Sequence, residues 1–557
     1  MRTNIRFKEL SSQQILLFPA SLDEKIPANH PVRVVSQIVD KLDINAILKS
    51  YKGGGTSSFH PRMMIKVLFY SYFNNLYSCR KIAQALQENI YFMWLSGNST
   101  PDFRTINDFR GRRLKEKIHD LFAEIVKLMS ELGFVSLDIQ YVDGTKIESA
   151  ANKYSFVWKK TTEKNKAKLE EKIKGVLTEI EGAINQDKAD QNSQQSEKPI
   201  DSQLLGEKVA ELNQRMDQLN KKQQKQVKKL ESEHLPKLEQ YEQQLETLGD
   251  RNSYSKTDVD ATFMRMKDDH MKNGQLKPAY NVQISTENQF VTNFTVHQRP
   301  GDTATLKGHL DQFEKDYGKQ SAIVVADAGY GSEQNYQDME SRGIEAYVKY
   351  NYFHKEQKRK HKNDPFHVDN LFYNAEKDFF VCPMGQKMTR AGESTRRSDL
   401  GYVSTVVSYK AQRCEGCPLR GLCHKSNNDR KIDINHKLRD YKAKTKERLL
   451  SEKGIELRKK RAIEPEAVFG QIKSNNRFNR FKMRGLQKID IDLGLAIIAH
   501  NLRKMAGRLF KDKNNGSTAL LLIKLNNRFC FFYFFNQKSR RSTSLKTSFN
   551  YNLKMAA

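Results

Sequence analysis

The architecture of this chain can be approached from the stretch Leu137-Asp-Ile-Gln-Tyr-Val-Asp-Gly-Thr-Lys146. Apolar and polar residues alternate up to Val142, which predicts a β-strand, and the Asp143-Gly144 pair that follows is typical of a turn. The sequence therefore predicts that Asp143 lies at the tip of a strand. The backbone is rigid at such a place, and we expect the carboxylate to be exposed there.

A second acid follows a second predicted strand. Ala322-Ile-Val-Val-Ala326 is nearly all apolar, and Asp327-Ala-Gly-Tyr-Gly331 comes directly after it. Such an apolar run is typical of a strand covered on both faces in an α/β sheet. Residues 332–343 show helix start and stop signals, and residues 344–349 show the pattern of the next strand. This βαβ pattern places Asp327 at the carboxyl end of its strand, where ligand sites of open α/β sheets lie.

The third acid is predicted at Glu466, within Arg461-Ala-Ile-Glu-Pro-Glu-Ala-Val-Phe-Gly-Gln-Ile-Lys473, a segment with helical spacing. Glu464 competes for this role, but residues two apart on a helix point about 200° from each other. Pro465 predicts that the first turn of the helix lies here, with Glu464 at its cap end. Glu466 shares a helix face with Lys473 and is therefore the predicted site residue.

These three blocks resemble the acidic motifs of DDE transposases from bacterial insertion sequences. Asp-Gly-Thr-Lys, Asp-Ala-Gly-Tyr-Gly and Glu-Ala-Val-Phe-Gly-Gln-Ile-Lys occur in the family's order, and the resemblance runs from about residue 5 to about residue 506. It implies an α/β ribonuclease-H-like catalytic core. Related families also place an arginine four residues before the glutamate and a lysine seven residues after it. Lys473 fits this pattern, whereas position 462 is alanine and Arg461 is one step away.

The resemblance implies metal-dependent DNA chemistry at Asp143, Asp327 and Glu466. Two Mg²⁺ or Mn²⁺ ions roughly 4 Å apart stabilise charge on the attacking and leaving oxygens, and these hard cations prefer carboxylate ligands. Asp143 is expected to bridge both ions, and each other acid to hold one. The expected function is DNA transposition: cleavage at the ends of an insertion sequence and strand transfer. The expected partners are double-stranded terminal inverted repeats and target DNA, bound by a homodimer.

Two other functions would use parts of the same pattern. A metal-dependent nuclease without strand transfer would have the same three acids but would not join DNA ends. A non-catalytic DNA-binding derivative of a transposase would bind the ends without cleaving them, and the intact set of acids argues against it. A strand-transfer assay separates the first alternative from a transposase.

The charge of the chain favours a polyanionic partner. Its 557 residues include 95 Lys and Arg against 66 Asp and Glu, which gives a formal net charge of +29. Neutralised phosphates release counterions, so this excess supplies DNA affinity without sequence recognition. A ribosome-associated or merely basic protein is the alternative. We see no secretory signal and no apolar run of the ~18 residues that a membrane helix needs, and we therefore expect a bacterial cytoplasmic protein, nucleoid-associated when bound to DNA.

Basic side chains in several segments are the candidate DNA contacts. Residues 28–133 show helical spacing with basic helix ends, which suit insertion against a duplex, and the family resemblance implies that residues 1–133 form an all-α DNA-binding domain. Residues 477–484 interleave arginines with Phe478 and Phe481, which is typical of a nucleic-acid contact. For the arginines of the first segment, a solvated helix face is the alternative. The candidate contacts are Arg110, Arg112, Arg113, Arg477, Arg480 and Arg484, to which the family resemblance adds Lys146 and Lys473.

The predicted core consists of residues 134–158 and 251–507, with an insertion between them. Residues 159–250 contain no Phe, Trp or Cys, and their apolar residues step by three and four on both sides of a polar linker. This predicts an inserted, coiled-coil-like helical hairpin. It is expected either to mediate dimerisation or to reach along DNA, and a passive insertion is the alternative. Residues 508–557 form a basic, aromatic tail beyond the family resemblance.

A cysteine region at residues 380–425 lies within the predicted core. It contains Cys382, Cys414, Cys417 and Cys423 between turn-rich stretches. Four thiolates in a reducing compartment suit tetrahedral zinc, and reduced structural cysteines are the alternative. Cys79 and Cys530 stand alone in the sequence and are expected to be packing residues.

Overall fold

The computed structural model describes residues 20–51, 58–186, 200–266, 274–398 and 400–511. Its centre is a mixed six-stranded sheet in which β4, β5, β1, β7 and β8 are neighbours in that order and β6 pairs with β5. β1 is antiparallel to β5 and parallel to β7, and β7 is parallel to β8. The strands are β1 (Ile139–Glu148), β4 (Thr262–Arg265), β5 (Leu276–Glu287), β6 (Phe290–His297), β7 (Ile323–Ala326) and β8 (Glu345–Val348). This mixed sheet agrees with the expected α/β core.

β1 does not end at Val142, so the predicted turn at Asp143-Gly144 is wrong. Asp143 pairs with Ile284 and Gly144 with Gln283, because the antiparallel partner β5 continues beyond this point. Gly144 has a packing role instead: a Cβ at this position would collide with the Gln283 side chain. The parallel partner β7, in contrast, pairs only with residues 139–141 of β1. Asp143 therefore lies just beyond the end of β7, inside a continuous strand.

Alternation along the strands decides which helices face the acids. Val142, Val324 and Val348 pack in one cluster with α12 (Leu306–Tyr317) and α13 (Glu333–Ser341). Tyr141, Val325 and Tyr347 pack in another, with α17 (His436–Leu450) and α18 (Glu452–Gly470). Asp143 lies two residues after Tyr141 and therefore points to the same face, toward α18.

The helix that carries the third acid begins earlier than predicted. α18 starts at Glu452, where Ser451 caps it, so Pro465 lies inside the helix and Glu464 is not near its start. The proline has no N–H to donate, and the helix tolerates this loss because α18 packs along the sheet. A π-helical turn, η6 (Gln471–Asn475), continues the helix to Lys473.

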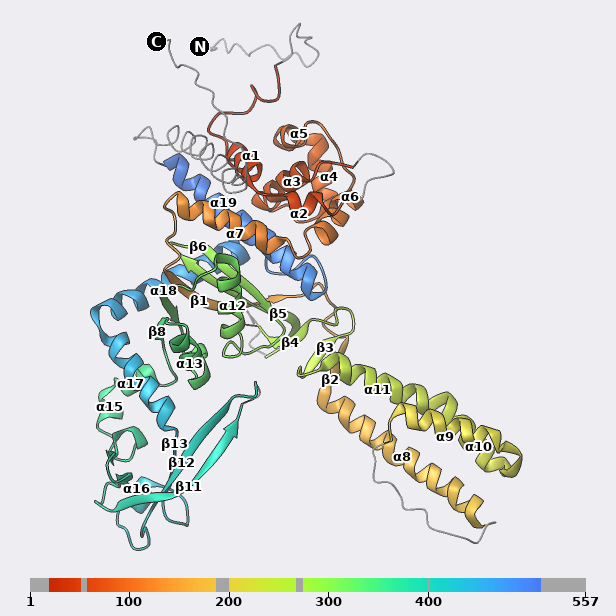
Figure 1. Cartoon of the computed structure of the whole chain (residues 1–557), viewed down its shortest axis with the longest axis vertical. Helices are drawn as coiled ribbons and strands as arrows, with labels where there is room; N and C mark the ends of the chain where they lie inside the picture. Colours follow the sequence, from red (N-terminus) through yellow and green to blue (C-terminus); the bar gives the residue numbers. More distant parts are fainter. Residues whose placement is uncertain (1–19, 52–57, 187–199, 267–273, 399, 512–557) are drawn as a thin grey trace, which may run out of the picture.

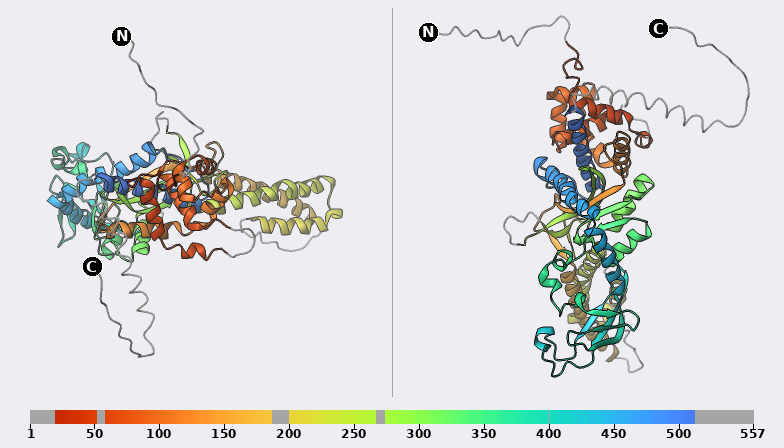
Figure 2. Two further views of the ribbon diagram at one scale, coloured as in Figure 1. Left: turned by 90° about the horizontal axis from the view of Figure 1, so that it is seen from above. Right: turned by 90° about the vertical axis from the view of Figure 1, so that its left-hand side faces the viewer.

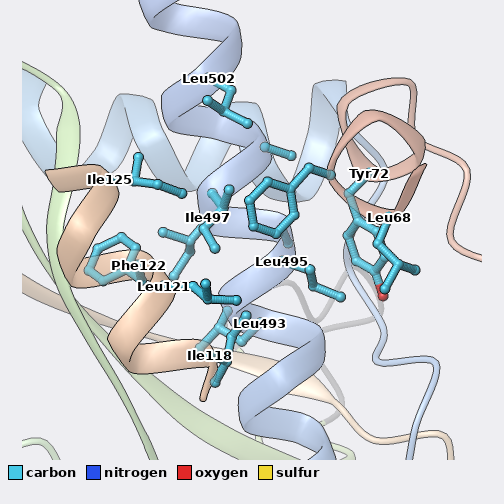
Figure 3. Packing of buried hydrophobic residues seen from close by; sticks show 14 of the residues in the cluster. Leu68, Tyr72, Ile118, Leu121, Phe122, Ile125, Leu493, Leu495, Ile497 and Leu502 are labelled. Carbon is cyan, nitrogen blue, oxygen red and sulfur yellow. The ribbon is translucent and has the colours of Figure 1, made fainter. Parts of the chain in front are cut away.

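The elements before β1 are all helices in the described part of the chain, and they share a hydrophobic core with the last helix. α19 (Leu486–Lys511) packs between α3, α7 and β6, and one cluster of buried side chains runs from Ile26 to Leu509. Figure 3 shows Leu68 and Tyr72 of α3 on one side of α19 and Phe122 of α7 on the other. These helices are α1 (Pro31–Lys41), α2 (Asn45–Leu48), α3 (Pro61–Phe73), α4 (Cys79–Glu88), α5 (Ile90–Ser96), α6 (Phe103–Asp108), η1 (Phe109–Arg113) and α7 (Ile118–Glu131). The 1–133 boundary stays a prediction.

The 159–250 insertion is helical but has three legs rather than the two of a hairpin. The first leg is α8 (Lys159–Gln186) and the second is α9 (Ser202–Gln214) with the short η2 (Met216–Gln218). The third is continuous from α10 (Lys221–Lys229) through η3 (Leu230–His234) to α11 (Leu235–Leu248). The predicted heptad positions share a separate core cluster, including Ile173, Val209 and Leu212. Figures 1 and 2 show these legs extending away from the sheet, with β2 (Phe156–Trp158) and β3 (Ser253–Ser255) paired at their base.

A second sheet lies in the chain between β8 and α17. Its five strands have the order β13-β12-β11-β10-β9, and the short helices α14 (Phe353–Glu356) and α15 (Arg359–Lys362) precede it. The strands are β9 (Phe372–Asn374), β10 (Phe379–Val381), β11 (Lys387–Arg397), β12 (Val403–Ala411) and β13 (Lys431–Ile434), with η5 (Val368–Asn370) before them and α16 (Arg420–Cys423) between the last two. The tail beyond residue 511 lies outside the described residues. Among the described helices, none combines the length and apolar character required to cross a membrane.

Candidate active site

The two predicted aspartates meet at one arginine. Arg461 Nη2 lies 3.2 Å from Asp143 Oδ1 and 3.4 Å from Asp327 Oδ2. The side chains of Asp143 and Arg461 are each 10% exposed, whereas that of Asp327 is 42% exposed. Because β1 and β7 are parallel neighbours, their carboxyl ends bring the two acids together. The guanidinium offsets the repulsion between the two carboxylates.

Glu466 and Glu464 leave α18 in different directions. Glu464 is buried, and its Oε2 accepts the Gln289 N–H at 2.6 Å in the β5–β6 turn. Burial raises the pKa of Glu464 above its usual range. Glu466 is exposed. Burial lowers the pKa of Lys349, as do Arg461 and Arg458, while Asp327 and Glu466 act in the opposite sense. Glu466 and Asp327 thus both raise the pKa of Lys349, whereas Glu464 is hydrogen-bonded to Gln289 in the turn after β5.

The site contains groups that we did not predict from the sequence. Tyr330, from the Asp-Ala-Gly-Tyr-Gly block, is fully buried; burial raises its pKa, and Asp302, Asp143 and Asp327 raise it further. Asp302 Oδ1 accepts from Asn281 Nδ2 at 2.8 Å and from Gln283 Nε2 at 3.0 Å. A Cβ on Gly144 would lie 2.9 Å from Asp302 Oδ1, and one on Gly329 would lie 3.8 Å from Asp302 Oδ2, so this fourth acid lies beside Gly144 and Gly329, on the face of β1 opposite to the Asp143 side chain. Asp302 follows β6 and lies outside the three motifs, and its place here depends on its contacts with the β5 side chains of Asn281 and Gln283.

Lys473 lies beside the acids, and Lys146 is farther along β1. Lys473 Nζ is 3.4 Å from Thr145 Oγ1, on the face of β1 that carries Asp143. Lys146 Nζ donates to the Arg265 carbonyl at 3.2 Å. The π-helical turn at residues 471–475 therefore directs one of the two predicted phosphate contacts to the acidic site.

The basic segment after α18 is only partly available to DNA. Phe478 and Phe481 are buried in the main hydrophobic cluster and are therefore not available to nucleic acid. Their apolar rings close the core between η6 and α19. Arg477, Arg480 and Arg484 are exposed. Two of them also fasten the chain after β1: Arg480 Nε donates to the Ser149 carbonyl at 3.0 Å and Arg484 Nε to the Ala150 carbonyl at 2.9 Å.

Of the three arginines predicted as DNA contacts near residue 110, one is buried. Arg110 is 4% exposed and donates to the Tyr72 hydroxyl at 3.1 Å and the Tyr77 carbonyl at 2.9 Å, so it is not available to DNA. The helical turn at 109–113 points this residue into the core. Arg113 is half-buried, and its guanidinium lies 4.2 Å from the Tyr51 ring centre. Arg112 is exposed and pairs with Asp108 at 3.0 Å.

The donor set of this site fits hard divalent cations. Asp143, Asp327 and Glu466 supply carboxylate oxygens, which Mg²⁺ and Mn²⁺ prefer. Asp143 and Asp327 already surround one positive charge, that of Arg461. The site therefore has the chemistry needed to hold cations against a phosphodiester.

Comparisons with known protein families agree with this arrangement. A family model described as a transposase DDE domain matches residues 381–506, which include Glu466 and Lys473. A second model, described as the transposase domain DUF772, matches residues 20–112 in the N-terminal helices. Neither a curated protein nor a solved structure shows a significant match to the chain. The two family matches, on separate parts of one chain, indicate a DDE transposase of the insertion-sequence type.

Proposed function

We propose that this protein binds the ends of its insertion sequence, cleaves the DNA there with two divalent cations and joins the freed ends to target DNA. The transposase families indicate DNA transposition in general. The single observation that carries the finer proposal is the convergence of Asp143 and Asp327 on Arg461 Nη2, at 3.2 and 3.4 Å, where α18 crosses the strand ends.

In this proposal Asp143, Asp327 and Glu466 hold the cations. The cations supply Lewis acidity at the attacking and leaving oxygens of the phosphodiester. Glu464 takes no part, because its carboxylate is bound to the Gln289 N–H. Asp302 is a positioning residue: it accepts hydrogen bonds from Asn281 and Gln283 and so holds these β5 side chains beside Gly144.

DNA would reach this site across a basic surface. Lys473, beside Thr145, is placed to contact a phosphate next to the acids. The exposed Arg477 lies four residues farther along the chain. The positive charges of these two side chains neutralise DNA phosphates. They fix the position of the DNA backbone rather than reading bases.

The experiment uses the purified full chain and a DNA fragment that carries both flanks of its own gene. With Mg²⁺ and a target plasmid, we expect cuts at the two element ends and covalent joining of those ends to the plasmid, both abolished by EDTA. Cleavage without joining would favour the metal-dependent nuclease. Binding of the ends with no cleavage in Mg²⁺ or Mn²⁺ would favour the non-catalytic derivative.

A further inference from the structure

The four cysteines of residues 380–425 line one small cavity. Cys382 directly follows β10, Cys414 follows β12, and Cys417 and Cys423 lie in the connection to β13. All four line a cavity of about 20 Å³, and all four are free thiols. Residues 32 positions apart in the sequence thus meet at one end of the second sheet, beside its own hydrophobic cluster.

Hydrogen-bond donors and arginine side chains surround the sulfur atoms of this cavity. The Arg430 backbone N–H donates to Cys414 Sγ at 3.3 Å, and Arg430 Nη1 donates to Cys423 Sγ at 3.0 Å. Arg413 and Arg420 also line the cavity. The sulfur atoms thus meet polar and charged groups of the protein rather than apolar side chains alone.

Simple packing of reduced cysteines does not account for this cavity. Three of the four cysteines are only half-buried, whereas packing thiols are usually fully buried. His424, on the same wall, has both ring nitrogens buried without a hydrogen-bond partner among the described residues. The wall of the cavity is therefore polar, unlike the wall of an apolar packing void.

We propose that this cavity binds one zinc ion through the thiolates of Cys382, Cys414, Cys417 and Cys423. Each thiol that binds releases its proton to solvent, and no other reactant is needed. The bound ion ties the end of β10 to the end of β12 and to the start of β13. It is a structural site, because four sulfur ligands complete the tetrahedron and leave no position for a substrate.

Binding requires the sulfur atoms to move closer together. Among the described residues, one trio of potential ligand atoms lies mutually within 4.8 Å, and it is His361, His367 and Asp369 rather than any three cysteines. Arg430 Nη1 donates a hydrogen bond to Cys423 Sγ in the metal-free form. In the proposal this bond breaks when zinc binds the sulfur. The histidine trio is the rival site, and the test separates the two.

The proposed zinc site takes no part in the proposed DNA chemistry, but it lies in the segment that connects two of the acids. The cysteine sheet stands between the strand that leads to Asp327 and the helix of Glu466. It is fastened to α13, since Tyr402 and Asn435 both bind Glu333, at 2.8 and 2.6 Å. Zinc therefore stabilises the connection between two acids without contacting either.

The test measures zinc by elemental analysis on the full chain, purified with reductant and without added chelator. We expect about one zinc per chain in the wild type. Cys414→Ser combined with Cys417→Ser should lose it, while Cys79→Ser, a buried cysteine outside the cavity, should retain it. His361→Gln combined with His367→Gln, and His424→Gln alone, should also leave the zinc content unchanged.

Several results would overturn the four-cysteine site: no zinc in the wild type, zinc retained by the double serine variant, or zinc lost from a histidine variant. If the serine variant does not fold, cobalt replaces zinc in the wild type. A strong near-ultraviolet thiolate-to-cobalt band supports sulfur ligation, and its absence contradicts it. DNA binding by the same preparations is a separate readout, so failure of zinc binding is not confused with failure of the transposition proposal.

Discussion

Arg461 is the residue around which the acidic site is organised in this structure. Its Nη2 lies within 3.4 Å of both strand aspartates. The family pattern places an arginine four residues before the glutamate, which is position 462 when the glutamate is Glu466. In this chain the arginine is one residue earlier, at 461. A guanidinium between two carboxylates is a charge that divalent cations must displace or share.

Replacing Arg461 should therefore strengthen metal binding. We expect Arg461→Ala to bind Mn²⁺ more tightly than the wild type, by up to about tenfold. The gain is limited because the Asp327 side chain is 42% exposed and water screens its share of the pairing. Mn²⁺ titration followed by electron paramagnetic resonance measures the affinity. Arg458→Ala, one turn earlier in α18, is the matched control and should leave it unchanged. Equal or weaker binding by Arg461→Ala would show that the arginine does not compete with cations.

His500 in α19 gives a prediction on pH. Its ring donates to the Gln289 carbonyl at 3.0 Å, and burial lowers its pKa from 6.5 to about 4. Between these values the unfolded chain binds a proton that the folded chain excludes, so this group destabilises the fold progressively as the pH falls from about 6.5 to 4.

His500→Gln keeps a donor for the Gln289 carbonyl but cannot take up this proton. Urea unfolding at pH 7 and pH 5 should show the stability of the wild type, relative to the variant, decreasing at the lower pH. A difference that is constant, or that grows in favour of the wild type, would contradict the assignment of His500 as a buried neutral group.

At the scale of elements, local patterns in the sequence predicted the type of an element better than its limits. The βαβ unit at Asp327 follows from local signals of apolar runs and turn residues, and the structure contains it. The Asp143-Gly144 pair wrongly predicts a turn, because the glycine is needed for close packing against the Gln283 side chain of the neighbouring strand. This is a long-range contact that a local pattern does not contain. Pro465 was misread as a helix start because α18 has further turns before it. Arg110 and Asp302 depend on tertiary packing that no local pattern contains.

The insertion should be separable from the core. Its apolar residues form their own cluster, and β2 and β3 close its base, with Lys159 N donating to the Asn252 carbonyl at 2.9 Å. Replacing residues 160–251 with a short Gly/Ser linker should leave a soluble protein whose remaining core unfolds with nearly the wild-type midpoint. Thermal unfolding followed by circular dichroism checks this. An insoluble product, beside a soluble full chain, would show that the three helical legs are part of the core.

At the scale of the whole molecule, the N-terminal helices and the six-stranded sheet are joined through α19. Asp492, in α19, is fully buried; it accepts from the Tyr72 hydroxyl of α3 and from the Lys482 N–H at 2.7 Å. Burial raises the pKa of Asp492, and Arg110 acts against this. The matched region of the DUF772 model and that of the DDE model thus share one buried polar network.

Breaking this network should destabilise both regions together. Asp492→Ala leaves the buried Tyr72 hydroxyl and the Lys482 N–H without their acceptor, and an unsatisfied buried polar group costs about 1–3 kcal/mol. We expect a lower midpoint in chemical unfolding, seen equally by probes in the N-terminal helices and in the sheet. Lys488→Ala, an exposed residue of the same helix, is the control. A loss below about 1 kcal/mol, or a transition confined to one region, would contradict the coupling.

The most direct test of the proposed active site compares the two glutamates of α18 in one assay. Full-length wild type, Glu466→Gln and Glu464→Gln are incubated with the element ends and Mg²⁺, and DNA binding and cleavage are measured on the same samples. Glu464 serves as the matched control, because its carboxylate accepts the Gln289 N–H and a glutamine can do the same. We predict that Glu466→Gln binds the ends but does not cleave them, whereas Glu464→Gln keeps substantial cleavage. Cleavage by Glu466→Gln, or its loss only in Glu464→Gln, would contradict the assignment of Asp143, Asp327 and Glu466 as the metal-binding acids.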